Sequence, residues 1–252
     1  YICSDETKLQ PQEMASYLEQ HQITHTCLTP SYLAYLPNHE RYSFQVLGVV
    51  GEACSEELAW RWAQQYPVFN LYGPTEITIC ASFAAIKVNE PVNIGGPMVN
   101  TEFYVVNADQ QLCPFGVTGE LYIAGKGLAK EYVNQPSLTA HKFVKIPAIA
   151  AEKRMYRTGD LVRYLPNGQL EYRGRADEQI KIRGHRVEPG EVERQLCLLD
   201  NILKAVVKVG LDSQGHKRML AYIELQRTVS QTAEFIEAVR NELRSKLPLF
   251  MV

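Results

Sequence analysis

The feature that most constrains the fold is an alternation of buried strands and amphipathic helices in the first ninety residues. Residues 44–50 form an apolar run broken only by Gln45, residues 56–65 have helical spacing, and residues 68–71 form a second strand-like run that is apolar except for Asn70. A continuous apolar run is typical of a strand that is covered on both faces, as in parallel sheets. Strand–helix–strand order therefore predicts a parallel sheet with helices on its faces. Upstream, the pattern predicts a helix over 11–20, a strand over 23–28 and a helix over 31–36.

The pattern changes near residue 92, where glycine and proline begin to separate short alternating runs. The runs at 102–106, 119–123 and 168–172 predict strands of a small barrel or bent sheet. Pro166-Asn167-Gly168 predicts a hairpin turn between two of these strands, 161–165 and 169–172. Beyond residue 175, the spacing predicts a strand over 179–183, a helix over 188–199, paired strands over 205–209 and 219–225, and a helix over 232–247.

These patterns predict a mixed α/β and α+β protein with two subdomains. The larger covers residues 1–176 and contains a parallel-sheet part, about 1–91, and a β part, about 92–176. The smaller α+β subdomain covers residues 177–252, with the boundary near 176–178.

Composition excludes several classes of partner. The chain has 252 residues, 21% of them charged, and a net charge of −2, which gives no reason to expect nucleic acid or an anionic membrane. No apolar run approaches the roughly 20 residues that a membrane span needs. The six cysteines form no C-x-x-C pair and are typical of free thiols in a reducing cytoplasm. His21 and His25 are four apart, but Gln22 stands where a zinc-protease motif needs Glu, so no metal site is expected there.

The strongest candidate for a binding site is the heptad Asn-Leu-Tyr-Gly-Pro-Thr-Glu at residues 70–76. It follows a predicted strand, and open α/β sheets bind ligands at the carboxyl ends of their strands. The Glu76 carboxylate and the Thr75 hydroxyl suit a metal–phosphate ligand, and an exposed Tyr72 ring suits stacking on a flat base. The same residues also fit a plain strand-to-turn corner in which Thr75 caps the next segment.

Four further sequence islands follow at 119–129, 156–160, 174–186 and 247–252. Within Tyr-Arg-Thr-Gly-Asp at 156–160, Asp160 suits a vicinal diol such as ribose, because a carboxylate accepts two hydrogen bonds, or it forms a simple Asx turn. The cations of 174–186 suit phosphate or form a solvated strand face. Each island alone is compatible with ordinary structure.

Taken together, the islands resemble the adenylation domain of nonribosomal peptide synthetases, within the acyl-adenylate-forming superfamily. The family motifs N-x-Y-G-P-T-E, G-E-L-x-I-x-G-x-G-L-A-R-G-Y, Y-R-T-G-D-L, G-R-x-D-x-Q-x-K-I-R-G-x-R-x-E and L-P-x-Y-M have counterparts from Asn70 to Val252. Similarity extends upstream to about Tyr1, and the Q-x-K-I-R-G form favours the amino-acid-activating branch. The resemblance implies a partial adenylate-forming-enzyme fold.

The resemblance also implies a reaction. ATP activates an amino acid as aminoacyl-AMP with release of pyrophosphate, and the aminoacyl group then passes to the phosphopantetheine thiol of a carrier domain. ATP and Mg²⁺ are the implied cofactors, and a condensation domain is the implied neighbour. Because the carboxylate attacks the α-phosphate in line, catalysis rests on positioning and charge stabilisation.

By position, the resemblance assigns roles to individual residues. Tyr72 stacks on adenine and Asn70 bonds its amino group. Thr75 helps to bind phosphate, and Arg175 contacts ribose or phosphate. Together with the Mg²⁺ ligand Glu76, they are the implied catalytic residues. Asp160 holds the ribose hydroxyls. Further nucleotide-binding positions are Gly51, Glu52, Ala53, Gly73 and Tyr172, and Asp177 marks the hinge between the subdomains.

The implied side-chain pocket consists of apolar or weakly polar residues: Cys27, Gly48, Val50, Leu71, Ile79 and Cys80. A buried unpaired charge would be strongly unfavourable there, so we expect an uncharged, hydrophobic amino acid. The room left by Gly48 favours an aromatic ring. Leu71, Ile79 and Cys80 are expected to face the amino acid, and Asn70, Tyr72 and Glu76 the nucleotide.

Some positions depart from the family pattern. Ala129-Lys130-Glu131-Tyr132 replaces A-R-G-Y, so Glu131 is strained if that position requires φ > 0, and Phe250 replaces a tyrosine. Tyr1 and Val252 look like cut ends, because the family's phosphate loop and α-amine aspartate precede Tyr1 and its catalytic lysine follows Val252. We therefore expect these 252 residues alone to be inactive. The alternatives are an acyl- or aryl-CoA ligase and a non-catalytic nucleotide-binding module.

Overall fold

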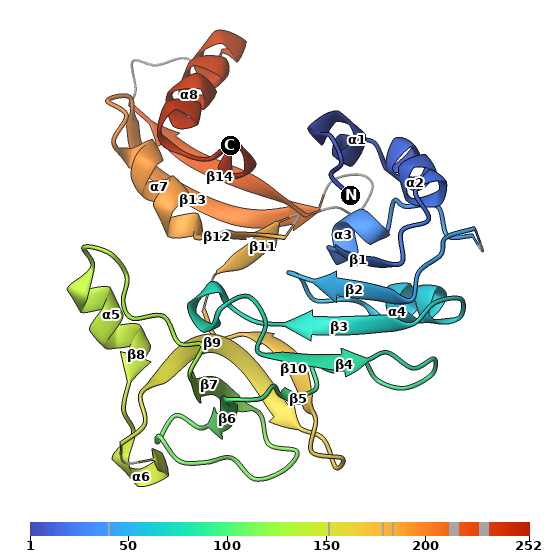
Figure 1. Ribbon diagram of the computed structural model, residues 1–252. Helices are drawn as coiled ribbons and strands as arrows, with labels where there is room; N and C mark the ends of the chain where they lie inside the picture. Colours follow the sequence, from blue (N-terminus) through green and yellow to red (C-terminus); the bar gives the residue numbers. More distant parts are fainter. Residues whose placement is uncertain (40, 151, 178, 183, 212–216, 227–231) are drawn as a thin grey trace. The chain divides into compact units, whose positions relative to one another are not determined.

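The computed structural model describes residues 1–39, 41–150, 152–177, 179–182, 184–211, 217–226 and 232–252 (Figure 1). The chain divides into two compact units, Tyr1–Asp177 and Glu178–Val252. The division lies one residue from the expected boundary after residue 176, and Glu178 itself lies outside the described residues. Each unit is described by itself.

The first unit begins with a five-stranded sheet of order β1-β2-β3-β4-β5 (Figure 1). Its strands are β1 (His25–Leu28), β2 (Val46–Val50), β3 (Val68–Tyr72), β4 (Ser82–Ala85) and β5 (Gly96–Pro97). Strands β1, β2 and β3 are parallel, as the sequence predicts, and β4 and β5 add antiparallel pairs. The helices of this part are α1 (Asp5–Leu9), α2 (Pro11–Gln20), α3 (Pro30–Leu33) and α4 (Glu56–Ala63).

Burial of the central strand explains the continuous apolar run. Leu47 and Val49 of β2 are fully buried and share one core with Trp62 of α4 and Leu18 of α2. Helix α4 begins where the Ser55 side chain accepts a hydrogen bond from the backbone N–H of Leu58, a standard N-cap. Fully burying side chains of this size contributes roughly 1.5–3 kcal/mol each, so the helices hold the parallel sheet in place.

The remainder of the first unit is an antiparallel sheet of order β10-β9-β7-β6, with β8 paired to β9. Its elements are β6 (Thr101–Val106), β7 (Gly119–Gly125), α5 (Pro136–Lys142), β8 (Phe143–Val144), α6 (Pro147–Ala150), β9 (Met155–Tyr164) and β10 (Leu170–Arg175). This antiparallel sheet is the β part that the sequence predicts, and single bridges extend it from Leu170 to Gly95 and from Val106 to Leu112. Its core contains Leu121, Ile123 and Val162 together with Tyr72 from β3, so the heptad packs against this second sheet.

The second unit is a small α+β fold. It contains β11 (Ile180–Ile182), β12 (His185–Val187), α7 (Pro189–Cys197), β13 (Ile202–Leu211), β14 (Lys217–Leu225), α8 (Ala233–Lys246) and the short 3₁₀ helix η2 (Leu249–Met251). Strands β13 and β14 pair as expected, whereas Arg183 of the strand predicted over 179–183 lies outside the described residues. Phe250 stacks on the His185 ring, with centroids 4.1 Å apart, so the phenylalanine at the family's tyrosine position has an aromatic partner. Within the described part, no helix is long and apolar enough to cross a membrane.

Candidate functional site

The heptad folds into a tight loop at the end of β3. After Gly73 and Pro74, a 3₁₀ turn, η1 (Thr75–Ile77), leads back to β4. A Cβ on Gly73 would lie 2.3 Å from the carbonyl oxygen of Ile79 and 2.7 Å from Cα of Cys80. Only glycine permits this approach, which explains why the heptad carries glycine at this position.

The side chains of β3 alternate between two faces of the sheet. Asn70 and Tyr72 are buried on one face, and Leu71 is half-buried on the other. The expectation of an exposed Tyr72 ring is therefore wrong: only 8% of the residue is exposed, because its face of β3 is covered by the antiparallel sheet. Asn70 likewise already donates its amide to the carbonyl of Asn93 at 2.9 Å. Burial raises the pKa of Tyr72 well above its usual value, with the Asp160 charge contributing.

A cluster of charged and hydroxyl side chains surrounds Asp160. The Tyr72 hydroxyl donates to Oδ2 of Asp160 at 2.5 Å, and Nη1 of Arg175 donates to Oδ1 at 2.8 Å. Arg175 also binds Asp177 in a bidentate pair, from Nε to Oδ1 at 2.6 Å and from Nη2 to Oδ2 at 2.7 Å. The structure therefore unites the residues predicted for ribose, for phosphate and for the hinge in one cluster, hereafter the Asp160 cluster (Tyr72, Asp160, Arg175, Asp177).

Burial and charge act in opposite directions on Arg175. Burial by itself lowers the pKa of the guanidinium, but hydrogen bonds and charges from Asp177 and Asp160 outweigh that effect, so the pKa is raised. Tyr172 lies beside the cluster, and its pKa is raised mainly by burial and then by the Asp160 charge. The arrangement keeps Arg175 charged and holds Asp160 in one orientation.

Two sequence islands hold the irregular stretch of β9 that carries Asp160. Gly159 has φ +78°, and a Cβ on it would lie 2.6 Å from Nη2 of Arg175. Glu120 accepts a hydrogen bond from the Gly159 backbone at 3.0 Å and pairs with Arg157 at 2.9 Å. The Gly-Glu-Leu island and the Tyr-Arg-Thr-Gly-Asp island are thus partners across β7 and β9, a relation that their sequences alone do not disclose.

Glu76 is buried, with 5% of the residue exposed, and Thr75 beside it is exposed. The Tyr132 hydroxyl donates to Oε1 of Glu76 at 2.5 Å, and the Ala129 backbone N–H donates to the Glu76 carbonyl at 2.8 Å. The sequence predicts no role for Tyr132. Tyr132 and Glu76 are 56 residues apart, so no local pattern indicates the contact between them. Glu131 lies outside the left-handed region, so the strain considered for it does not arise.

Three of the expected pocket residues meet on adjacent parallel strands. A Cβ on Gly48 would lie 2.6 Å from Sγ of Cys27 and 2.9 Å from Cδ1 of Leu71. The space beside Gly48 is therefore filled by these two side chains, and the expected room for an aromatic ring at that point is wrong. Val50 pairs in register with Leu71.

Ile79 and Cys80 lie on the loop after η1. Ile79 is 77% exposed and has φ +68°, directly after Thr78 with φ +62°. A β-branched residue in the left-handed region is an outlier that stores strain. The pKa of the Cys80 thiol is raised by burial and, to a smaller extent, by Cys27, so these two expected pocket residues lie near each other.

Residues 51–53 follow β2 at the same sheet edge at which the heptad follows β3, because the two strands are parallel. Glu52 accepts a hydrogen bond at 3.0 Å from the backbone of Ser31, which follows β1. The loops after β2 and β3 thus carry predicted site residues, and the segment after β1 binds one of these residues, Glu52.

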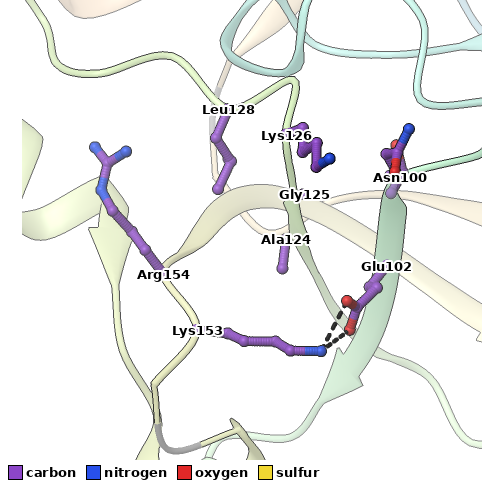
Figure 2. Close-up of a pocket in the computed structure, with 9 residues that line it drawn as sticks. Asn100, Glu102, Ala124, Gly125, Lys126, Leu128, Lys153 and Arg154 are labelled. Carbon is purple, nitrogen blue, oxygen red and sulfur yellow. Dashed lines mark hydrogen bonds and ion pairs between the residues drawn. The ribbon is translucent and has the colours of Figure 1, made fainter.

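A separate pocket of about 660 Å³ lies where β6, β7 and the start of β9 meet (Figure 2). Lys126, Lys153 and Arg154 contribute positive charge, and Lys153 reaches across to Glu102 at 2.5 Å. None of the residues predicted for the site lines this pocket.

Comparison with known proteins gives a consistent result. The sequence model "AMP-binding enzyme" matches residues 1–133. Bacitracin synthase 3 of Bacillus licheniformis is 42% identical over 96% of the chain, which spans 4% of the synthase.

Two solved structures resemble the chain. One, NpsA-ThdA from Klebsiella oxytoca, is an artificially fused adenylation–PCP di-domain; it is 26% identical with TM-score 0.79 over 96% of the chain and 46% of that structure. The other, AB3403, a four-domain nonribosomal peptide synthetase bound to AMP and glycine, is 33% identical with TM-score 0.65 over all of the chain and 19% of that structure.

The fold is that of the adenylate-forming enzymes. The chain belongs to the AMP-binding enzyme family and is an adenylation-domain sequence of the nonribosomal peptide synthetase type. It spans only a small part of the synthases that it matches.

Proposed function

We propose that the protein activates an amino acid with ATP, forming aminoacyl-AMP and releasing pyrophosphate, and then loads it onto the phosphopantetheine thiol of a carrier domain. The observation that supports this most is the Asp160 cluster, which lies next to the heptad through the Tyr72 hydroxyl. Similarity to an adenylation–PCP di-domain supports a carrier partner. A neighbouring condensation domain and a cytoplasmic location complete the proposal.

Asp160 acts as the acceptor for the ribose diol. Its two oxygens accept from Tyr72 and Arg175, and the Tyr172 hydroxyl also lies within hydrogen-bonding reach of the carboxylate. An ionised carboxylate offers about four lone-pair positions, so acceptor capacity remains for a ribose hydroxyl. Tyr72 therefore acts through its hydroxyl, by orienting Asp160, more than through an open ring face. Asn70 lines the adenine side, and Arg175 supplies positive charge near ribose and phosphate. Asp177, at the end of the first unit, acts as the hinge.

Glu76 and Thr75 form the phosphate end of the site. Among the described residues no group of three or more His, Cys, Asp or Glu side chains gathers as a metal cage. A single carboxylate nevertheless fits Mg²⁺, which proteins usually hold through one or two carboxylates and the substrate's phosphates. When bound, Mg²⁺ would neutralise developing phosphate charge; Glu76 would hold it and the exposed Thr75 hydroxyl would contact phosphate. The loop at 51–53 would contribute backbone groups and Glu52 at the same edge.

The amino acid is proposed to be uncharged and hydrophobic. Cys27, Leu71 and Val50 form an apolar surface on β1–β3, with Ile79 and Cys80 on the neighbouring loop. No charged side chain belongs to this set, so a charged substrate would be left without a partner. The filled space beside Gly48 removes the argument for an aromatic ring in particular.

The test is ATP–pyrophosphate exchange by the full-length protein that carries this sequence, with a panel of amino acids. We expect exchange with uncharged amino acids and little with Lys, Arg, Asp or Glu. Formation of a CoA thioester from an acyl or aryl acid would favour a CoA ligase instead. Nucleotide binding without exchange would favour a non-catalytic module. We also propose that the 252 residues alone give no exchange, because the resemblance assigns a phosphate loop and a lysine to segments outside them.

A further inference from the structure

Tyr132 makes a side-chain hydrogen bond to the Glu76 carboxylate. Its hydroxyl donates to Oε1 at 2.5 Å, and Glu76 is 5% exposed. We propose that Tyr132 is a positioning residue: it fixes the orientation in which Glu76 binds a divalent cation with ATP. This inference rests on the proposed function of Glu76.

The segment that contains Glu76 cannot fix this carboxylate by itself. It is a three-residue 3₁₀ turn followed by two left-handed residues, Thr78 and Ile79. A glutamate side chain on so short a turn has several accessible rotamers, and a partner from elsewhere must select one. The loop at 127–132 supplies such a partner in Tyr132, and it also binds the turn, because the Thr78 hydroxyl donates to the Gly127 carbonyl at 2.8 Å.

Tyr132 is itself held from several sides. Its backbone N–H donates to the Thr139 hydroxyl at 3.0 Å, and its ring lies 5.6 Å from the Phe143 ring. The Arg154 guanidinium lies 4.1 Å from the centre of the Phe143 ring and donates to the Ala129 carbonyl at 2.8 Å. Arg154, drawn in Figure 2 at the border of the pocket, thus fixes the loop that carries the tyrosine.

The chain contains a matched control for this pair. Tyr104 donates to Oε2 of Glu102 at 2.6 Å, so the chemistry is the same. The Glu102 side chain is 47% exposed and binds Lys153, and it lies in the pocket outside the predicted site. Removing the Tyr104 hydroxyl therefore tests for any general effect of losing a tyrosine–glutamate hydrogen bond.

The experiment compares Tyr132→Phe, Tyr104→Phe and Glu76→Gln in the full-length protein. Phenylalanine keeps the ring packing against Phe143, so Tyr132→Phe changes only the hydroxyl. Binding of Mn²⁺ is measured by electron paramagnetic resonance in the presence of ATP, without amino acid and so without turnover. We expect Tyr132→Phe to weaken Mn²⁺ binding about tenfold, as loss of an outer-shell partner does. We expect Tyr104→Phe to leave Mn²⁺ binding unchanged. We also expect excess Mg²⁺ to restore ATP–pyrophosphate exchange in Tyr132→Phe.

The outcomes separate the two proposals. If Glu76→Gln weakens Mn²⁺ binding and Tyr132→Phe does not, the positioning role is overturned while the metal role of Glu76 stands. If Glu76→Gln leaves Mn²⁺ binding unchanged, the metal role fails and the positioning role fails with it. If Tyr132→Phe and Tyr104→Phe weaken Mn²⁺ binding equally, the effect reflects a general loss of stability. That result would also contradict the inference.

Discussion

The two sides of the candidate site are built in different ways. On the proposed nucleotide side, Asp160, Arg175 and Tyr72 are buried or nearly so, and Tyr72 and Arg175 donate to Asp160 through hydrogen bonds of 2.5 and 2.8 Å. On the proposed amino-acid side, Cys27 is exposed and Ile79 is 77% exposed, and the contacts are apolar. The two sides meet at β3, because alternate residues of that strand point to opposite faces, whereas Asp160 and Arg175 come from the antiparallel strands β9 and β10.

This difference has a chemical reason. All ATP molecules present the same ribose and phosphates, so a rigid, charge-assisted cluster suits that side. Amino acids differ in their side chains, and an apolar surface discriminates among them by size and charge with few fixed bonds. Substitutions on the nucleotide side should therefore abolish function, whereas those on the other side should change preference.

The largest effect is expected from Asp160→Ala. The change removes the diol acceptor and leaves the buried Arg175 and Tyr72 without it. Loss of hydrogen bonds to a charged group predicts a fall of more than about 100-fold in kcat/KM for ATP, and the broken buried pair lowers stability by about 3 kcal/mol. Exchange kinetics and thermal unfolding check this, with the exposed Asp109→Ala as control. An unchanged kcat/KM would remove Asp160 from the site.

The second largest effect is expected from Gly73→Ala. Its Cβ would meet backbone atoms at 2.3–2.8 Å, so the loop at 79–81 must move. Overpacking of this kind costs about 2 kcal/mol, and Tm should fall by several degrees. Gly96→Ala is the matched control, since nothing lies within 4 Å of its Cβ position. If both variants melt alike, the close packing of the heptad loop is not required.

A smaller effect is expected at Cys27, on the amino-acid side. With the cognate amino acid at ten times its Kd, alkylation of Cys27 should slow about tenfold by mass action. Cys197, exposed in the second unit, should react at an unchanged rate. Cys54 should stay unreactive at pH 8, because burial raises the pKa of its thiol to about 11 and leaves little thiolate. Mass spectrometry of the alkylated peptides gives all three rates. If no amino acid changes the alkylation rate of Cys27, strand β1 does not contribute to the amino-acid pocket.

The smallest effect is expected from Ile79→Gly. Glycine removes the backbone strain of the left-handed conformation, about 1 kcal/mol, but it also makes the unfolded chain more flexible, which lowers stability. The net free energy of unfolding should therefore rise by about 0.5 kcal/mol. The same change at Val88, which is outside the left-handed region, should lower stability instead. Thermal unfolding shows whether stability rises in Ile79→Gly and falls in Val88→Gly. A loss of stability in Ile79→Gly would contradict the inference that Ile79 is strained.

Local signals in the sequence were sufficient for much of the fold. Pro11 marked the start of α2, and the apolar run at 44–50 marked the buried β2. Helix α1 was missed, because five residues capped by Ser4 show no periodicity. The strand β4 was missed as well, since Ser82–Ala85 is a short run without turn signals at both ends.

The site was predictable where one residue's chemistry was enough, and not where long-range packing decides. A diol acceptor at Asp160 follows from the residue and its motif. Burial of Tyr72 depends on which face of β3 the second sheet covers, and the filled space at Gly48 depends on side chains from two other strands. The contact between Tyr132 and Glu76 joins residues 56 positions apart, which no local pattern encodes.

The measurement that bears most directly on the central claim is amino-acid-dependent ATP–pyrophosphate exchange by the full-length protein, run in parallel for the native sequence and Asp160→Ala. The account predicts exchange that requires an uncharged amino acid and disappears in the variant. Exchange that needs no amino acid, that prefers a charged one, or that survives in Asp160→Ala would contradict it.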